Sequence, residues 1–174
     1  LPDNTFRFYT ARSEMGQGVT TGLSTLLGEE LDVNPLDMDI RLAGVHEDYV
    51  NPAFGMQGTG GSSSIRAHYM QLRQVGANTR ALILEAASTD LGVPVSSLVT
   101  DSGFVVQGEN RYPYAAFIQT AQTLSIDGDA PLKPASQFKY IGQDTRRVDA
   151  IAKATGTAQF GIDVDVPGMH YAVI

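Results

Sequence analysis

The sequence predicts a mixed α+β fold: a small sheet with two main helices on one face, followed by an incomplete β-rich segment. Apolar residues alternate over residues 6–10 and 37–43, which is the period-two pattern of half-buried strands. Apolar residues recur at helical spacing over 21–32 and 65–90. A return to β-branched sequence punctuated by turn residues predicts the final segment, residues 138–174.

The opening unit is predicted to be strand, helix, strand. Thr20 or Thr21 is expected to cap the first helix, because a threonine hydroxyl accepts a hydrogen bond from a free N–H of the first turn. Pro35 follows the end of this helix, where it prevents continuation. Glu29 and Glu30 are expected on its exposed side. Its apolar face consists of leucines, namely Leu23, Leu26, Leu27 and Leu31.

The long second helix is the clearest predicted element. It should run from Ile65 to about Leu91, where Gly92 and Pro94 stop it. Shorter elements are expected after it: a helical turn at 96–98, a hairpin from Val99 to Val106 that returns near Arg111, and a helix over 114–124.

The chain divides into three parts: a first module over 1–124, a proline-bearing linker over 125–137, and the β-rich segment 138–174. The start "LPDNTFRFYT" has neither an initiator Met nor a signal-peptide pattern, and the end "VDVPGMHYAVI" stops inside an apolar stretch. We therefore expect the sequence to be a fragment of a longer protein. An unfinished strand would leave an open edge, through which copies of the chain could associate.

Composition argues against several function classes. The chain has 12 basic and 19 acidic residues and a net charge of −7, which disfavours binding to nucleic acid or to an anionic membrane surface. The absence of cysteine excludes thiolate metal sites, iron–sulfur ligation and thiol nucleophiles in these residues. No apolar run approaches the ~20 residues that span a bilayer. The three histidines are scattered, so no protein-ligated metal is expected.

Two glycine-rich loops, residues 16–18 and 58–64, precede the two main helices. A helix start carries free N–H groups and a positive dipole end, and both favour anions. Glycine lets the backbone approach a ligand closely. Two such loops together predict a grip on the phosphates of a large cofactor, whereas one alone would be a plain turn with a helix cap. The Gln17 side chain can donate and accept hydrogen bonds, which suits recognition of a cofactor. The alternative is that this side chain is simply solvated.

Familiar nucleotide motifs fit these loops poorly. In "GMQGTGGS", Gly61 stands where a P-loop needs lysine. Gly16 and Gly18 form a G-x-G turn, but Thr21 occupies the place of the third Rossmann glycine. A nucleotide-binding domain that uses this turn for phosphate remains an alternative. So does a non-catalytic module whose loops are only turns and whose long helix serves packing or interaction.

Two stretches, "EMGQGVTTGLSTLLGEELDV" and "GMQGTGGSSSIRAHYMQLRQVGANTRALILEAA", resemble the molybdopterin-binding part of the xanthine dehydrogenase and aldehyde oxidase superfamily. The resemblance extends in particular to the beta (large) subunit of isoquinoline 1-oxidoreductase and its bacterial relatives. It implies that 1–124 is part of the molybdopterin-binding domain and that 125–137 is a linker. Residues 138–174, with "DVPGM", resemble the start of the superfamily's β-rich hammerhead domain, here truncated.

The resemblance implies a molybdenum hydroxylase, which hydroxylates an N-heterocycle or an aldehyde with oxygen derived from water. The group's usual cofactor is the cytosine dinucleotide form of molybdopterin with molybdenum, which two anion-binding loops would suit. The metal would arrive on the pterin and need no protein ligand here. Matching the family's loops residue by residue gives the implied cofactor-binding set Met15, Gly16, Gln17, Gly18, Gly60, Gly61, Ser62, Ser63 and Ser64.

Charged residues near the loops receive separate predictions. Arg66 lies in the first turn of the long helix beside the serines and is expected to pair with a phosphate. Arg66, Arg73 and Arg80 recur every seven residues and should form a mostly solvated stripe. Glu14 reads as a solvated residue at a strand end. The family's glutamate base belongs near the end of the large subunit, so no catalytic residue is assigned here and the fragment alone should be inactive.

The resemblance also implies a partner, a small iron–sulfur subunit that carries two 2Fe-2S clusters. A chain without cysteine fits this division, because the clusters must then lie elsewhere. The sequence does not distinguish the bacterial cytoplasm from the periplasm, and it does not identify the substrate.

Overall fold

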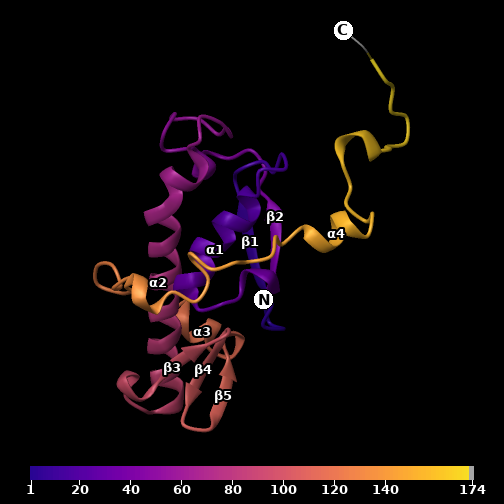
Figure 1. Cartoon of the computed structure of the whole chain (residues 1–174). Coiled ribbons are helices and arrows are strands. Elements are labelled where there is room, and N and C mark those ends of the chain that lie inside the picture. The colour runs from indigo at the N-terminus through magenta and orange to yellow at the C-terminus, as the bar shows by residue number, and fades with distance from the viewer. Residues whose placement is uncertain (173–174) are drawn as a thin grey trace.

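The computed structural model describes residues 1–172. Its helices and strands confirm the predicted α+β class (Figure 1). The elements in chain order are β1 (Phe6–Thr10), α1 (Val19–Leu31), β2 (Met38–Leu42), α2 (Ser64–Leu91), β3 (Val99–Asp101), β4 (Phe104–Gln107), β5 (Asn110–Pro113), α3 (Ile118–Ala121) and α4 (Ala150–Ala154). Within this described part, no helix is both long and apolar enough to cross a membrane.

The first unit is a β–α–β arrangement, as predicted. β1 and β2 pair in parallel with Phe6 opposite Met38, and α1 makes the crossover that a parallel pair requires. α1 lies between this pair and α2 (Figure 1). The core between them is formed by Val19, Leu23 and Leu26, against which Phe8, Tyr69 and Leu72 pack.

The N-terminus of α1 differs from the prediction. The helix begins at Val19, and its N-cap is Gly18 in the left-handed conformation, with φ 81°. Thr20 and Thr21 therefore lie inside the first turn, and the prediction that a threonine caps this helix is wrong. The C-terminus of α2 follows the prediction, because Gly92 forms a left-handed cap with φ 65°.

The second half of α2 packs on an antiparallel sheet of order β3-β4-β5, which contains the predicted hairpin. The predicted helix over 114–124 is shorter: a 3-10 turn over Tyr114–Phe117 leads into the four-residue α3. Side chains three residues apart align in a 3-10 turn, and Tyr114 and Phe117 are both buried here. They join the larger core with Leu31, Val33, Ile83, Ala86, Ala87, Leu98 and Val105.

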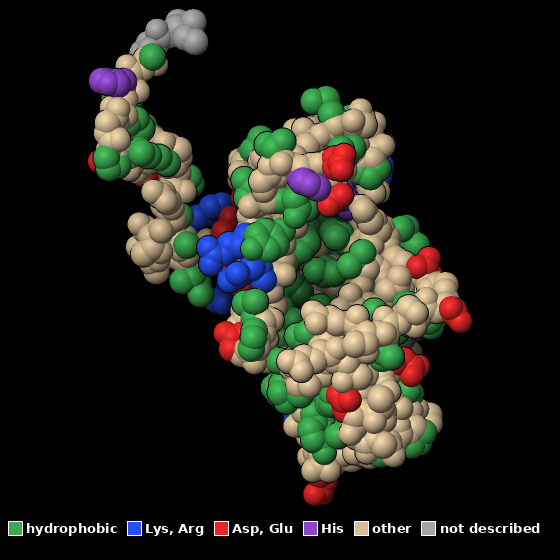
Figure 2. Space-filling view, turned by 180° about the vertical axis from the view of Figure 1, so that it is seen from behind, with side chains coloured by type: hydrophobic (Ala, Val, Ile, Leu, Met, Phe, Trp, Pro, Cys, Tyr) green, Lys and Arg blue, Asp and Glu red, His purple; other side chains and the backbone are tan. Residues whose placement is uncertain are grey.

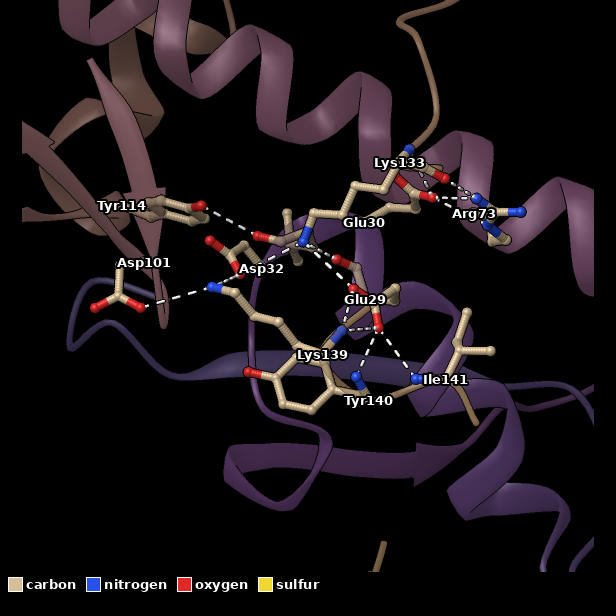
Figure 3. A network of polar contacts seen from close by, with 11 residues as sticks. Glu29, Glu30, Asp32, Arg73, Asp101, Tyr114, Lys133, Lys139, Tyr140 and Ile141 are labelled. Atoms are coloured by element: carbon tan, nitrogen blue, oxygen red, sulfur yellow. Dashed lines mark hydrogen bonds and ion pairs between the residues drawn. The ribbon is translucent and has the colours of Figure 1, made fainter. Parts of the chain in front are cut away.

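Buried carboxylates of α1 attach both the predicted linker, through the N–H of Lys133, and the start of the segment that follows it (Figure 3). Glu29 and Glu30 are fully buried, which overturns the prediction that they are exposed. Glu30 forms an ion pair with Arg73 at 2.7 Å, so Arg73 is also not part of a solvated stripe. Glu29 accepts backbone hydrogen bonds from Tyr140 at 2.7 Å and Ile141 at 3.1 Å. The two carboxylates can be buried because Glu30 is paired with a cation and Glu29 accepts hydrogen bonds. Their partners lie far from them in the sequence.

Beyond this attachment, the chain leaves the body as an extension (Figure 1). Residues 138–172 contain α4 and a 3-10 turn over Gly161–Asp163 but no strand, so the β-rich pattern expected there is not formed in the described residues. A strand needs a neighbour to receive its backbone hydrogen bonds, and none of the five strands pairs with this segment. The last two residues of the expected segment, 173–174, lie outside the described part. Its assignment to a hammerhead-like domain stays a prediction, as does self-association through a strand edge.

Candidate functional site

The two glycine-rich loops meet at one cleft of about 410 Å³. They converge because α1 and α2 pack together and each loop leads into one of these helices. A Cβ on Gly22 of α1 would stand 2.7 Å from Cδ1 of Ile65, so glycine at this position lets the two helix starts approach. The cleft is lined by Met15, Gln17, Gly18, Val19, Gly22, Thr59, Gly60, Ser62, Ser64 and Ile65.

Arg12 and Ser13, which precede the first loop, bind the second loop directly. The N–H of Ser13 donates to Oγ1 of Thr59 at 2.9 Å, and Nη1 of Arg12 donates to the carbonyl of Gly58 at 2.8 Å. The Arg12 side chain is buried, and its Nη2 lies 3.1 Å from Nε2 of His68. No salt bridge to Arg12 occurs within residues 1–172, and its Nε has no hydrogen-bond partner there. A buried cation therefore lies directly behind the second loop.

The second loop presents an open helix start to the cleft. Ser63 turns inward, donating to the carbonyl of Gly60 at 2.8 Å and accepting from Asn51 at 2.8 Å. Ser62 and Ser64 line the cleft instead. Among the described residues, no side chain caps α2 and no acceptor meets its first N–H groups, those of Ser64, Ile65 and Arg66. An anion in the cleft would find both free N–H groups and the positive end of a 28-residue helix.

The first loop is different, because a carboxylate already occupies its N–H groups. Glu14 accepts hydrogen bonds from the N–H of Gly16 at 2.8 Å, Gly18 at 2.9 Å and Thr20 at 3.1 Å. Partial burial would raise the pKa of Glu14, but these hydrogen bonds outweigh it and lower the pKa below its ordinary value. The interpretation of Glu14 as a solvated residue is therefore wrong. This carboxylate also replaces the threonine cap expected for α1.

Gln17 closes the turn with its own side chain. Its Oε1 accepts from the N–H of Met15 at 2.6 Å, and its Nε2 donates to the carbonyl of Ser13 at 3.0 Å. The carboxamide thus uses both its donor and its acceptor capacity within the loop. Gly16 and Gly18 have φ values of 99° and 81°, which glycine adopts without strain. Met15 is 69% exposed at the edge of the cleft.

The cleft brings together six of the ten predicted cofactor-binding residues, namely Met15, Gln17, Gly18, Gly60, Ser62 and Ser64. Four do not line it. Gly16 is exposed in the first loop but is not among the lining residues, Ser63 is buried, and a Cβ on Gly61 would face the ring of Phe54 at 3.2 Å. Arg66 is exposed and forms no salt bridge within residues 1–172. The role of these residues as cofactor contacts stays a prediction.

Sequence reasoning missed a contact from the extension to the first loop. Nη1 of Arg147 donates to the carbonyl of Gly16 at 2.7 Å, and its Nη2 lies 3.3 Å from Oε1 of Glu14. The N–H of Val148 donates to Oγ1 of Thr21 at 3.1 Å. Figure 2 shows Lys and Arg side chains gathered where the extension leaves the body. A basic residue 131 positions away in sequence gives no local signal of such a contact.

The chemistry of the cleft is that of a binding site. Its lining offers backbone N–H groups, the hydroxyls of Thr59, Ser62 and Ser64, and apolar contact from Val19 and Ile65. No titratable side chain is among the lining residues, so the lining itself offers no group for proton transfer. A Cβ on Gly60 would meet nothing within 4 Å, so space remains for a ligand against the backbone. This donor set fits a phosphate-bearing organic cofactor.

Comparison with known proteins agrees with this geometry. The molybdopterin cofactor-binding domain family matches residues 1–172. The chain is 31% identical over 98% of its length to a membrane-bound aldehyde dehydrogenase (pyrroloquinoline-quinone) of Gluconacetobacter polyoxogenes. It is 30% identical over 92% to the beta subunit of isoquinoline 1-oxidoreductase from Brevundimonas diminuta, and 29% identical over 95% to a subunit of nicotinate dehydrogenase from Pseudomonas putida.

These relatives are much longer than the chain, which spans 22%, 25% and 14% of their respective lengths. The match to the family nevertheless covers both glycine-rich loops, both main helices and the extension as far as residue 172. The resemblance predicted from the two loops is confirmed. The chain belongs to the molybdopterin cofactor-binding domain family.

Proposed function

We propose that the cleft between the two loops holds the phosphates of molybdopterin in its cytosine dinucleotide form, within the large subunit of a molybdenum hydroxylase. The observation that carries this proposal is the convergence of two glycine-rich loops on one cleft with an open helix start. The free N–H groups of α2 and the hydroxyls of Ser62 and Ser64 would bind a phosphate oxygen. Membership of the molybdopterin family supports the choice of cofactor class.

The rest of the reaction follows from this assignment. The bound cofactor would supply the redox-active metal that takes two electrons from the substrate. The residues of this chain would bind and orient the cofactor, while the base that accepts the proton comes from outside the chain. The substrate is an N-heterocycle or an aldehyde, hydroxylated with oxygen from water, and a small subunit with two 2Fe-2S clusters accepts the electrons. On this account the 174 residues alone are inactive.

A substitution that fills the cleft tests this proposal. Gly60→Val would place a branched side chain where a Cβ has no neighbour within 4 Å, so the loop should still fold while the ligand space is lost. Gly58→Val is a matched control, because a Cβ there also meets nothing within 4 Å and Gly58 does not line the cleft. Both residues have φ outside the left-handed region, so valine adds no strain of that kind.

The measurement is molybdenum and cytidine nucleotide released per chain from the protein at its natural length, purified with its small subunit. We expect both in the wild type and in Gly58→Val, and neither in Gly60→Val. If Gly60→Val retains both, the cleft is not the binding site. A wild type that contains nucleotide without pterin would indicate a nucleotide-binding domain. One that contains a quinone in place of the pterin would overturn the cofactor assignment, and one with no cofactor would favour a packing module.

A further inference from the structure

We infer that Glu14 and Arg147 are positioning residues that together hold the 16–18 loop in its cofactor-receiving shape. The inference deepens the proposed function and rests on it. It makes the segment that follows the linker part of the cofactor site. The segment comes from the C-terminal part of the sequence and contacts Gly16 and Thr21, neither of which lines the cleft.

Glu14 selects which N–H groups of the loop remain available. Its carboxylate accepts hydrogen bonds from the N–H groups of residues 16, 18 and 20, which are every second residue along the backbone. The intervening N–H groups, those of Gln17 and Val19, have no acceptor within residues 1–172, and both residues line the cleft. A carboxylate that fixes one set of N–H groups thereby presents the other set to a ligand. The loop is formed before any ligand arrives, which lowers the entropy cost of binding.

Arg147 contacts both the loop and the Glu14 carboxylate. Its guanidinium donates to the carbonyl of Gly16 at 2.7 Å and lies 3.3 Å from the Glu14 carboxylate. Asp149 orients it through two parallel hydrogen bonds of 2.9 Å, from Nε and from Nη2. Lys153 forms an ion pair with the same Asp149. This fork geometry is specific to arginine, because a lysine ammonium cannot contact the carbonyl and both carboxylates in one plane.

The charges explain why both residues are needed. A lone carboxylate beside an anion-binding cleft would repel the ligand that the cleft is built to hold. Here two cations, Arg147 and Lys153, balance two anions, Glu14 and Asp149. Removal of Arg147 leaves one uncompensated negative charge next to the loop. Removal of the Glu14 charge as well should therefore restore part of the cofactor binding. A contact that only supported the fold would not show this rescue.

The test compares Arg147→Ala, Glu14→Gln and the double variant in the protein at its natural length, purified with its small subunit. Molybdenum and nucleotide per chain are measured by elemental analysis and chromatography, and hydrogen exchange is followed in peptides that cover residues 13–22. Arg147→Lys tests the fork. Arg146→Ala is the control, because it removes the same charge from an exposed neighbour with no salt bridge within residues 1–172.

We expect cofactor content to fall about threefold or more in Arg147→Ala and less in Arg147→Lys, with faster exchange across residues 13–22 in Arg147→Ala. The double variant should regain part of the cofactor. Arg146→Ala should match the wild type. Full cofactor content in Arg147→Ala, or a double variant no better than Arg147→Ala alone, would overturn the inference. A wild type without cofactor would instead refute the proposed function, so the two failures are distinguishable.

Discussion

Replacement of one buried carboxylate should detach residues 139–141, which follow the linker, from α1. Glu29 is fully buried, and its Oε2 accepts the N–H groups of Lys139, Tyr140 and Ile141 at 3.0, 2.7 and 3.1 Å. In Glu29→Gln the amide oxygen can still accept these three hydrogen bonds, but the acceptor is no longer charged. The loss of the charge weakens each hydrogen bond by roughly 0.5–1 kcal/mol. The new NH₂ group faces Nζ of Lys133, 3.5 Å from Oε1 in the wild type. We expect a loss of about 2–3 kcal/mol in the free energy of unfolding.

Urea unfolding of the 174-residue chain measures this loss, and hydrogen exchange locates it. Glu85→Gln is the control, because Glu85 is exposed on α2 and its replacement should change stability by less than about 0.5 kcal/mol. In Glu29→Gln the amides of residues 139–141 should exchange faster than those of α2. If Glu29→Gln is as stable as Glu85→Gln and exchange at 139–141 is unchanged, the carboxylate does not hold residues 139–141 against α1.

Three further predictions concern the core and the second loop. Gly76→Ala should destabilise the chain by about 2–3 kcal/mol in urea unfolding, because its Cβ would meet the carbonyl of Leu27 at 2.7 Å; an unchanged midpoint would contradict this packing. Tyr114→Phe should cost about 1–2 kcal/mol by the same measurement, since it leaves the buried Leu31 carbonyl without its 3.1 Å hydrogen bond. Burial, together with the charge of a neighbouring guanidinium, lowers the pKa of His68 from its ordinary 6.5. As the pH falls below 6.5 the unfolded chain therefore takes up this proton before the folded chain does, and stability falls with it. The drop between about pH 7 and pH 5.5 should be smaller in His68→Gln, and an equal drop in both proteins would refute the assignment.

The predicted elements that the structure confirms are those specified by local pattern. The 3.6-residue period and the Gly92 cap define α2 without reference to any other part of the chain. The β–α–β unit likewise follows from two alternating strands and one apolar helix face. The helix over 114–124 failed as a local prediction, because tertiary packing of two aromatic side chains favours a 3-10 turn at that point.

Three of the wrongly predicted charges, Glu29, Glu30 and Arg73, have partners that are distant in sequence. Glu29 has the sequence environment of a surface residue, and only the backbone of residues 139–141, more than 100 positions away, makes its burial possible. Glu14 was also predicted to be solvated, although its partners are only two to six residues away. A local signal was present in that case: a carboxylate four residues before the helix N-cap can reach back to the first-turn N–H groups, as a side-chain cap does.

The expectation that both helix starts are free for anions therefore needs a physical refinement. Two positive helix ends packed side by side repel each other, and a resident carboxylate at α1 removes that repulsion while α2 stays open. On the proposed function, the first loop would contribute the N–H groups of Gln17 and Val19, and the second would contribute the start of α2 with the hydroxyls of Ser62 and Ser64. Such unequal loops would give a ligand one strong phosphate position and one weaker contact beside it. A cofactor that carries phosphate at one end and an uncharged ring system at the other would bind them in a single orientation, whereas two equal helix starts would accept it in either.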